Sequence, residues 1–229
     1  MKLTLIKKTT ISRGVVAFKF SSGKKLDFKA GQYLRYELEH KDPDERGIFR
    51  FFTISSAPFE EYIMLTTRIL EEGGSSFKKK LDSLDIGESL YAYGPMGEFV
   101  VGDSKQGSML FIAGGIGITP FRSIILDLDH KGDIEDLRLL YCTKDEPVPF
   151  KKEFEKIEKR RKGLSIDYIK PPEICDIDVI KDRSSDFIER KVFVSGPIGM
   201  VQSLEKVLKS NGLGENDLKF DYFPGYKNE

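Results

Sequence analysis

A glycine-rich segment between two apolar runs has the residue types of an anion-binding turn. Residues 113–120 read Ala-Gly-Gly-Ile-Gly-Ile-Thr-Pro. This order predicts a strand, a tight turn and a helix, and such a turn presents backbone N–H groups to an anion where the helix begins. Gly115 and Gly117 would let a ligand approach the backbone, and Pro120 suits a first helical turn that does not need its N–H. Taken alone, the segment also fits a turn that serves only tight packing.

A second group of side chains suited to ligand binding lies upstream, in one short run. Arg50 can pair with a phosphate, Phe52 offers an aromatic face to a flat ring, and Thr53 offers a hydroxyl to a ring nitrogen. On an ideal strand these side chains do not all point the same way, but they can line one extended ligand that lies along the strand. The alternative is a partly buried strand with a solvated arginine.

Charge and cysteine content exclude several classes of protein. Lys plus Arg and Asp plus Glu both number 37, so no net charge attracts nucleic acid or an anionic membrane. The only cysteines are Cys142 and Cys175. They exclude a cysteine-ligated iron–sulfur cluster within this chain, which needs about four thiolates, and they suit a reducing compartment. No metal-ligand spacing occurs around His40 or His130, so no metal site is predicted.

The chain carries no evident membrane or export signal. No apolar stretch approaches the roughly twenty residues that span a bilayer. Residues 1–8 lack the apolar core of a signal peptide. We therefore expect a cytoplasmic protein with no membrane span, and a monomer by default.

The first part of the chain has the pattern of a small antiparallel barrel of six strands. Short runs rich in β-branched and aromatic residues alternate with turn residues. One helix is expected over residues 76–83, where Phe77, Leu81 and Leu84 recur with a helical period. The expected strands cover residues 3–8, 15–20, 32–38, 49–55, 62–69 and 89–93.

After residue 103 strands and helices alternate, which predicts a parallel sheet with helices on both faces. The expected strands cover residues 109–113, 137–142, 164–169, 191–195 and 218–223. The expected helices cover residues 121–130, 151–162, 184–189 and 199–210. The sequence thus predicts two domains, a β-barrel over residues 1–103 and an α/β nucleotide-binding domain over residues 104–229.

The motifs and their order resemble those of the ferredoxin–NADP reductase superfamily. Residues 50–53, Arg-Phe-Phe-Thr, are similar to the family's Arg-x-Tyr-Ser or Arg-x-Tyr-Thr signature. Further segments match in the family's order over nearly the whole chain: Gly-Gln-Tyr at 31–33, the flavin pyrophosphate loop at 73–77, Gly-Pro-x-Gly-x-Phe at 94–99, the nicotinamide loop at 115–120, the Cys-Gly-Pro-x-x-Met segment at 195–200 and the Glu-x-Phe-x-Gly-Tyr tail at 221–226.

The resemblance implies that the barrel binds FAD. Arg50 would hold the diphosphate, Phe52 would lie against the isoalloxazine ring with Phe51 in the same motif, and Thr53 would hydrogen-bond near the flavin N5. The diphosphate would also receive N–H and hydroxyl groups from three consecutive residues, Gly74, Ser75 and Ser76.

The resemblance also implies that the second domain binds NADPH or NADH. Ser195 and Gly196 would border the nicotinamide. The residues expected to hold the nucleotide are Gly115, Gly117, Thr119 and Pro120. The second strand of this domain ends in Thr143 and Lys144 with no acid before Asp145, which slightly favours NADP because a basic residue suits the 2′-phosphate.

The expected catalytic residues are Thr53, Ser195 and Asp221, and two of them depart from the family pattern. Ser195 replaces the usual cysteine, so hydride transfer is slower unless another group compensates. Asp221 stands where many members carry glutamate, and either a role in proton handling or an exposed strand-end carboxylate fits. Phe52 replaces a tyrosine and loses its hydroxyl. Tyr226 either covers the flavin ring or belongs to a flexible tail.

These features imply an FAD-dependent NAD(P)H oxidoreductase of the ferredoxin–NAD(P) reductase type. Electrons would pass through the flavin to a separate acceptor, namely a ferredoxin, a flavodoxin, a cytochrome, a ferric chelate or another subunit. One alternative is an NAD(P)H reductase that uses free flavin as a substrate. The other is a non-catalytic or regulatory electron-transfer subunit that docks on a partner.

Overall fold

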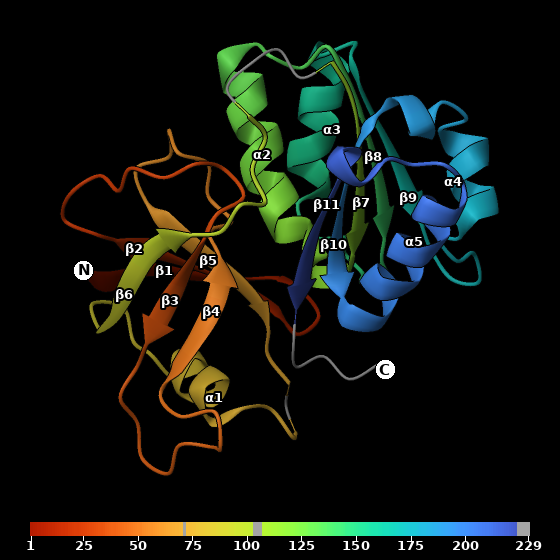
Figure 1. Cartoon of the computed structure of the whole chain (residues 1–229). Helices are drawn as coiled ribbons and strands as arrows, with labels where there is room; N and C mark the ends of the chain where they lie inside the picture. The colour runs from red at the N-terminus through yellow and green to blue at the C-terminus, as the bar shows by residue number, and fades with distance from the viewer. Residues whose placement is uncertain (71, 103–106, 224–229) are drawn as a thin grey trace.

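The N-terminal part of the chain is an antiparallel six-stranded sheet, as predicted. The computed structural model describes residues 1–70, 72–102 and 107–223 (Figure 1). The strand order is β4-β3-β6-β1-β2-β5, and an antiparallel bridge between Ile54 and Leu65 joins the two edges, so the sheet curves into a barrel. The strands are β1 (Lys2–Ser12), β2 (Val15–Ser21), β3 (Tyr33–Glu37), β4 (Phe49–Thr53), β5 (Ile63–Arg68) and β6 (Ser89–Met96).

Alternation along the strands fills the barrel. In β2, Val16, Phe18 and Phe20 point inward and are buried, as expected for a strand with one face on the core. The helix α1 (Ser76–Asp82) closes one end with Phe77 and Leu81, which are fully buried. The helical period of these residues therefore predicted both the helix and its buried face.

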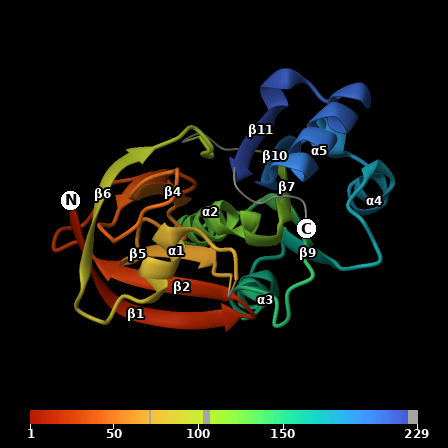
Figure 2. The same cartoon turned by 90° about the horizontal axis from the view of Figure 1, so that it is seen from below.

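The C-terminal part is a parallel five-stranded sheet in the order β11-β10-β7-β8-β9. In β7 alternate residues serve two cores: Phe111 packs toward α2 and α3, and Ile112 toward α4 and α5. Helices cover both faces, which explains why these strands read as continuous apolar runs (Figure 2). The elements are β7 (Ser108–Gly114), α2 (Ile118–Lys131), β8 (Asp136–Cys142), α3 (Lys151–Arg160), β9 (Leu164–Ile169), α4 (Ile177–Arg183), β10 (Lys191–Pro197), α5 (Ile198–Ser210) and β11 (Leu218–Phe223).

One predicted helix is wrong. A helix was expected over residues 184–189, whereas α4 spans Ile177–Arg183 and only a 3-10 turn covers Phe187–Glu189. Asp176 begins α4 early because its carboxylate accepts hydrogen bonds from the N–H groups of Asp178 and Val179. Only Ile180 of this helix is buried, so its apolar period is too short to stand out in the sequence.

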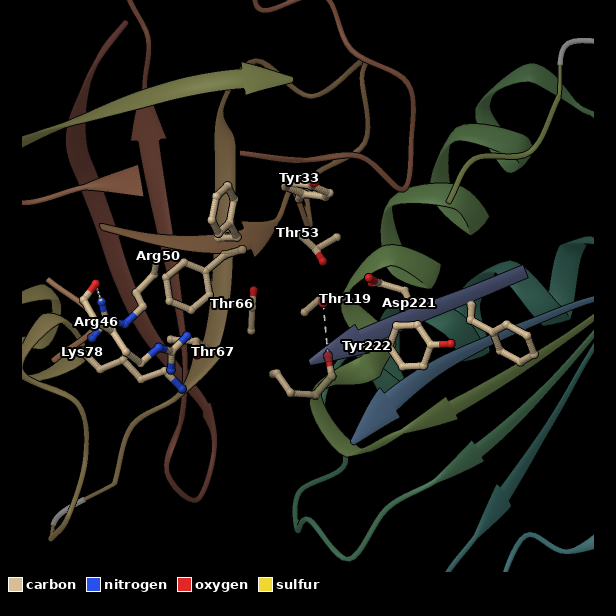
Figure 3. A pocket seen from close by; sticks show the side chains of 14 residues that line it. Tyr33, Arg46, Arg50, Thr53, Thr66, Thr67, Lys78, Thr119, Asp221 and Tyr222 are labelled. Carbon is tan, nitrogen blue, oxygen red and sulfur yellow. Dashed lines mark hydrogen bonds between the residues drawn. The ribbon is translucent and has the colours of Figure 1, made fainter. Parts of the chain in front are cut away.

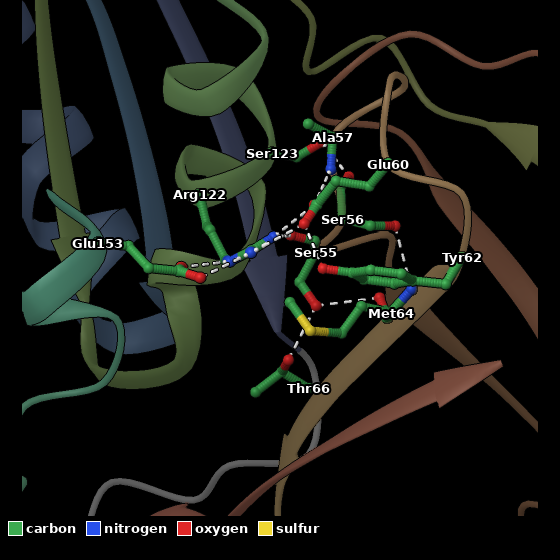
Figure 4. A network of polar contacts seen from close by, with 10 residues as sticks. All are labelled: Ser55, Ser56, Ala57, Glu60, Tyr62, Met64, Thr66, Arg122, Ser123 and Glu153. Atoms are coloured by element: carbon green, nitrogen blue, oxygen red, sulfur yellow. Dashed lines mark hydrogen bonds and ion pairs between the residues drawn. The ribbon is translucent and has the colours of Figure 1, made fainter. Parts of the chain in front are cut away.

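Helix α2 joins the two halves of the molecule. Arg122 of this helix is 2% exposed and makes ion pairs with Glu60 of the barrel and Glu153 of α3. It also donates to the carbonyl of Ser55, and the Ser123 hydroxyl donates to the carbonyl of Ser56 at 2.6 Å (Figure 4). This network fixes α2 against the barrel. The domain boundary expected at residues 103/104 lies outside the described residues and stays a prediction.

Candidate active site

A cleft with a volume of about 380 Å³ lies between the barrel and the parallel sheet. Figure 3 shows side chains from both halves facing each other across it, with Tyr33 and Thr53 on one side and Thr119 and Asp221 on the other. Its lining residues are Tyr33, Arg46, Arg50, Phe51, Phe52, Thr53, Thr66, Thr67 and Lys78 from the barrel half, and Ile116, Thr119, Phe220, Asp221 and Tyr222 from the other.

The barrel wall of the cleft is aromatic. Phe52 is half-buried and packs on Phe77, with ring centroids 5.8 Å apart. Phe51 points the opposite way, is 53% exposed and meets the edge of Tyr33 at 5.8 Å. Thr53 is buried at the end of β4. The run alternates as an ideal strand does, yet all its residues reach the cleft because β4 is an edge strand of the sheet.

The opposite wall carries a half-buried carboxyl group. Parallel pairing of β10 and β11 sets Ser195 beside Asp221, and the Ser195 hydroxyl donates to Asp221 Oδ2 at 3.5 Å. Burial raises the pKa of Asp221 to about 7, although the hydrogen bond from Ser195 opposes the shift. Asp221 is therefore a half-buried carboxyl at the edge of the cleft rather than an exposed strand-end carboxylate.

The raised pKa of Asp221 is expected to make stability depend on pH. The folded protein holds the Asp221 proton more tightly than the unfolded chain, so wild-type stability falls as pH rises from the ordinary pKa of 3.8 toward about 7. Asp221→Asn removes this titration. We expect the free energy of unfolding of the variant, relative to wild type, to be higher at pH 8 than at pH 5 in urea unfolding. Asp217→Asn, at an exposed position, is the control, and an equal difference at both pH values would contradict the assignment.

The glycine turn has two different structural roles. Gly115 has φ +52° with open space around its Cβ position, which suits a backbone exposed to a ligand. At Gly117 a Cβ atom would lie 2.2 Å from the carbonyl oxygen of Ser195, so this glycine serves close packing against β10. Thr119 lines the cleft and donates to the Ile116 carbonyl at 3.1 Å, whereas Pro120 is buried in the first turn of α2.

The residues expected near the adenosine end of the nucleotide lie outside the cleft. Thr143 is buried and accepts a hydrogen bond from the Asp145 N–H at 3.1 Å, and Lys144 is exposed. Asp145 is paired with Arg68 of the barrel at 2.6 Å. The carboxylate of Asp145, which follows β8, is therefore held by an arginine of the barrel.

The expected diphosphate loop does not line the cleft. Ser75 caps α1 by accepting from the Lys78 N–H at 3.3 Å, while Gly74 and Ser76 border a separate surface hollow. Arg50 is 3% exposed, and its guanidinium is bound by the carboxylate of Asp44. The cleft thus fits a flat aromatic ring, but the Arg50 guanidinium that is expected to hold a diphosphate is already paired with a side chain.

Several residues around the site were not singled out from the sequence. Asp44 lies in the loop between β3 and β4 and belongs to none of the motifs, and Tyr33 enters only as part of the Gly-Gln-Tyr motif. Thr66 and Thr67 carry no local motif, and Tyr222 stands at the variable second position of the 221–226 tail. Strand pairing brings all three to the cleft. Tyr226 lies outside the described residues.

Two absences concern only the described part of the chain. No helix within it is both long and apolar enough to cross a membrane. No three of its His, Cys, Asp or Glu residues gather as a group that could hold a metal ion.

Comparisons with known proteins agree with this architecture. Residues 2–101 match the family model "Oxidoreductase FAD-binding domain", and residues 111–206 match "Oxidoreductase NAD-binding domain". A solved ferredoxin-NADP+ reductase from Plasmodium falciparum superposes with a TM-score of 0.83 at 16% identity, covering 97% of this chain and 95% of that one. The flavohem-like FAD/NAD-binding domain of nitric oxide dioxygenase from Vibrio cholerae superposes with a TM-score of 0.80 at 20% identity, covering 97% of this chain and 98% of that one.

Curated relatives are longer than this chain. The glycine betaine monooxygenase reductase subunit of Chromohalobacter salexigens is 27% identical over 206 residues, which cover 81% of this chain and 53% of that protein. The reductase component of phenol 2-monooxygenase from a Pseudomonas species is 27% identical over 214 residues, covering 86% and 58%. The chain thus spans little more than half the length of these relatives.

A barrel and a parallel sheet that enclose one cleft define a class of two-domain oxidoreductases in which a flavin and a nicotinamide nucleotide meet. With both family models matched in this order, the chain belongs to the oxidoreductases in which an FAD-binding domain precedes an NAD-binding domain, and its fold is that of the ferredoxin–NADP+ reductases. Its cofactors are FAD and a pyridine nucleotide.

Proposed function

We propose that this protein is an NAD(P)H oxidoreductase that passes electrons through FAD to a separate one-electron acceptor. The observation that carries the proposal is the cleft between the two domains. There an aromatic strand of the FAD-binding half faces Thr119 and Asp221 of the NAD-binding half. The FAD, when bound, accepts a hydride from the reduced nicotinamide and can release electrons singly.

The residues of the chain would position the rings and control water and protons. Phe52 would support one ring face, and Thr53 would offer a hydroxyl at the ring edge. Gly115 and Thr119 would place the nucleotide opposite that ring, so that the reacting atoms start close together. Asp221, with Ser195 behind it, would hold or release a proton at the edge of the cleft.

The names of the relatives support an external acceptor. Both curated relatives are named as the reductase subunit or component of a monooxygenase. A carrier protein, a cytochrome or a ferric chelate would serve as the acceptor of this chain. A cytoplasmic location and a monomeric state remain predictions.

A second candidate function is supported by one specific observation. The carboxylate of Asp44 occupies the arginine that the FAD diphosphate is expected to use. A weak hold on the diphosphate favours a reductase that binds free flavin as a substrate and then releases it. The same cleft would serve both activities.

The two candidates differ in how long flavin stays on the protein. For the first, protein loaded with FAD and passed through gel filtration keeps its flavin and reduces cytochrome c with NADPH or NADH. For the second, the filtered protein is colourless, and turnover returns in proportion to added FMN or riboflavin. No turnover under either condition would contradict both candidates.

Nucleotide preference provides a separate prediction. We propose that Lys144 contacts the 2′-phosphate, since it is exposed directly after β8 and the neighbouring Asp145 is paired with Arg68. Lys144→Ala is expected to raise the KM for NADPH by about tenfold, the loss of one charged contact, and to leave the KM for NADH nearly unchanged. Lys162→Ala, beyond α3, is the control. An equal change for both nucleotides would contradict this role.

A further inference from the structure

The carboxylate of Asp44 lies between the two groups expected to hold the flavin diphosphate. Arg50 Nη2 donates to Asp44 Oδ1 at 2.5 Å and to Oδ2 at 2.7 Å. The N–H of Ser76 donates to Oδ2 at 2.9 Å, and the N–H of Arg46 donates to Oδ1 at 3.0 Å. A single internal carboxylate therefore receives hydrogen bonds from both sides of the expected diphosphate site.

Both terminal nitrogens of Arg50 already donate within the protein. Its Nη1 donates to the carbonyl oxygens of Arg46, Gly47 and Phe49 at 3.0, 2.9 and 2.6 Å. Its Nη2 serves Asp44, and Nε is the remaining donor, buried with no partner among the described residues. A guanidinium has five N–H groups. No fork of two parallel N–H groups, the geometry that binds a phosphate best, remains for a ligand.

The loop around Asp44 is held by further contacts. The Asp44 N–H donates to the Ser76 hydroxyl at 2.9 Å, and His40 Nε2 lies 2.9 Å from the same oxygen. Burial opposes ionisation of Asp44, but hydrogen bonds from Arg50, Arg46 and Ser76 hold its pKa at about 2. The carboxylate is therefore negatively charged at neutral pH.

We propose that Asp44 is an internal anion that competes with the flavin diphosphate for Arg50 and Ser76, and so determines which flavins bind tightly. The proposal rests on the proposed function, because it assumes that the flavin ring occupies the cleft. Asp44 would thus select against the diphosphate of FAD, whereas the residues expected from the sequence would bind it.

Electrostatics gives the direction of the effect. If Asp44 keeps its place, its charge repels the diphosphate; if it leaves, its ion pair with Arg50 is lost before the diphosphate can replace it. Either route weakens FAD binding. Riboflavin carries no phosphate and is indifferent to Asp44, so the ratio of the two affinities isolates the competition from ring stacking.

The test is equilibrium binding of FAD and of riboflavin to wild type and Asp44→Asn, followed by flavin fluorescence. The variant removes the charge and keeps an oxygen that accepts from the Ser76 N–H. We expect FAD to bind at least about tenfold tighter to the variant, as for one interaction with a charged group, and riboflavin to bind equally to both proteins. Unchanged or weaker FAD binding alongside unchanged riboflavin binding would overturn the proposal.

Two further variants control the test. Asp42→Asn removes a charge from the same loop without touching Arg50 and is expected to leave both affinities unchanged; a gain equal to that of Asp44→Asn would overturn the specific competition. Asp44→Asn combined with Arg50→Met is expected to lose the gain, since the freed guanidinium provides it. A gain that persists without Arg50 would also overturn the proposal.

The outcomes separate this proposal from the proposed function. Intact riboflavin binding by Asp44→Asn shows that the variant is folded around the cleft; if it is lost, Asp44→Ser repeats the test with the same expected gain. If neither FAD nor riboflavin binds to wild type or to any variant, that result would contradict the proposed function itself. Flavin binding without an Asp44 effect would contradict only the competition.

Discussion

Replacing Gly117 by alanine is expected to slow flavin reduction by NAD(P)H on the order of 100-fold, because a displacement of about 1 Å of reacting groups has effects of this size. The new Cβ atom would lie 2.2 Å from the Ser195 carbonyl oxygen and 2.7 Å from Gly196 Cα. Both are backbone atoms of β10, so the turn before α2 must move away from the strand. The residues that face the flavin across the cleft, Thr119 above all, move with it.

The measurement is single-turnover flavin reduction by stopped-flow absorbance, with FAD in excess. Gly132→Ala is the control, since Gly132 lies at the far end of α2 with open space around its Cβ position, although its φ of +80° differs from the −59° of Gly117. We expect the control to lose about 1 kcal/mol of stability and to reduce flavin at the wild-type rate. A Gly117→Ala rate within threefold of wild type would contradict the packing role of this glycine.

The largest expected effect on stability comes from Arg122→Met. Methionine fills similar space but leaves Glu60, which is mostly buried, without its cation, and leaves the Ser55 carbonyl without the donor. Burial opposes the charge on Arg122, but Glu153 and Glu60 raise its pKa. Burial likewise opposes the charge on Glu60, but its contact with Arg122 lowers the pKa of Glu60. Breaking such a buried pair costs about 3–5 kcal/mol. We expect this loss in the free energy of unfolding.

Urea unfolding at neutral pH measures the Arg122 effect. Arg138→Met is the matched control, because Arg138 pairs with Asp186 at 3.0 Å near the surface, where a pair contributes about 1 kcal/mol or less. A free energy of unfolding of Arg122→Met within 1 kcal/mol of the wild-type value would contradict the role of this network in joining the domains. Weakened flavin reduction with FAD still bound would show that the network also positions the nucleotide domain.

Local patterns predicted most of the fold. The strands of the barrel alternate, α1 shows a clear period through Phe77 and Leu81, and the parallel strands read as apolar runs bounded by turns. These signals act within a few residues of the chain. Helix α4 was misplaced because its seven residues bury only Ile180, and its start depends on the cap at Asp176 rather than on a periodic face.

The site was predicted only in part, because its key contacts are non-local. The aromatic strand and the glycine turn follow from motifs, whereas Asp44 reaches Ser76 across 32 positions, and Arg122 reaches Glu60 across 62. No local sequence pattern indicates that Asp44 contacts Ser76 or that Arg122 contacts Glu60. Gly117 shows the same limit: its spacing predicts a turn, but its closeness to Ser195 depends on how β10 lies beside β7.

The most direct test of the account is anaerobic mixing of the FAD-loaded protein with NADPH and, separately, with NADH, followed by the visible absorbance of the flavin. The account predicts that at least one nucleotide bleaches the flavin band completely, and that a one-electron acceptor added afterwards restores it. A bound flavin that neither nucleotide reduces would contradict the claim that the cleft brings flavin and nicotinamide together for hydride transfer.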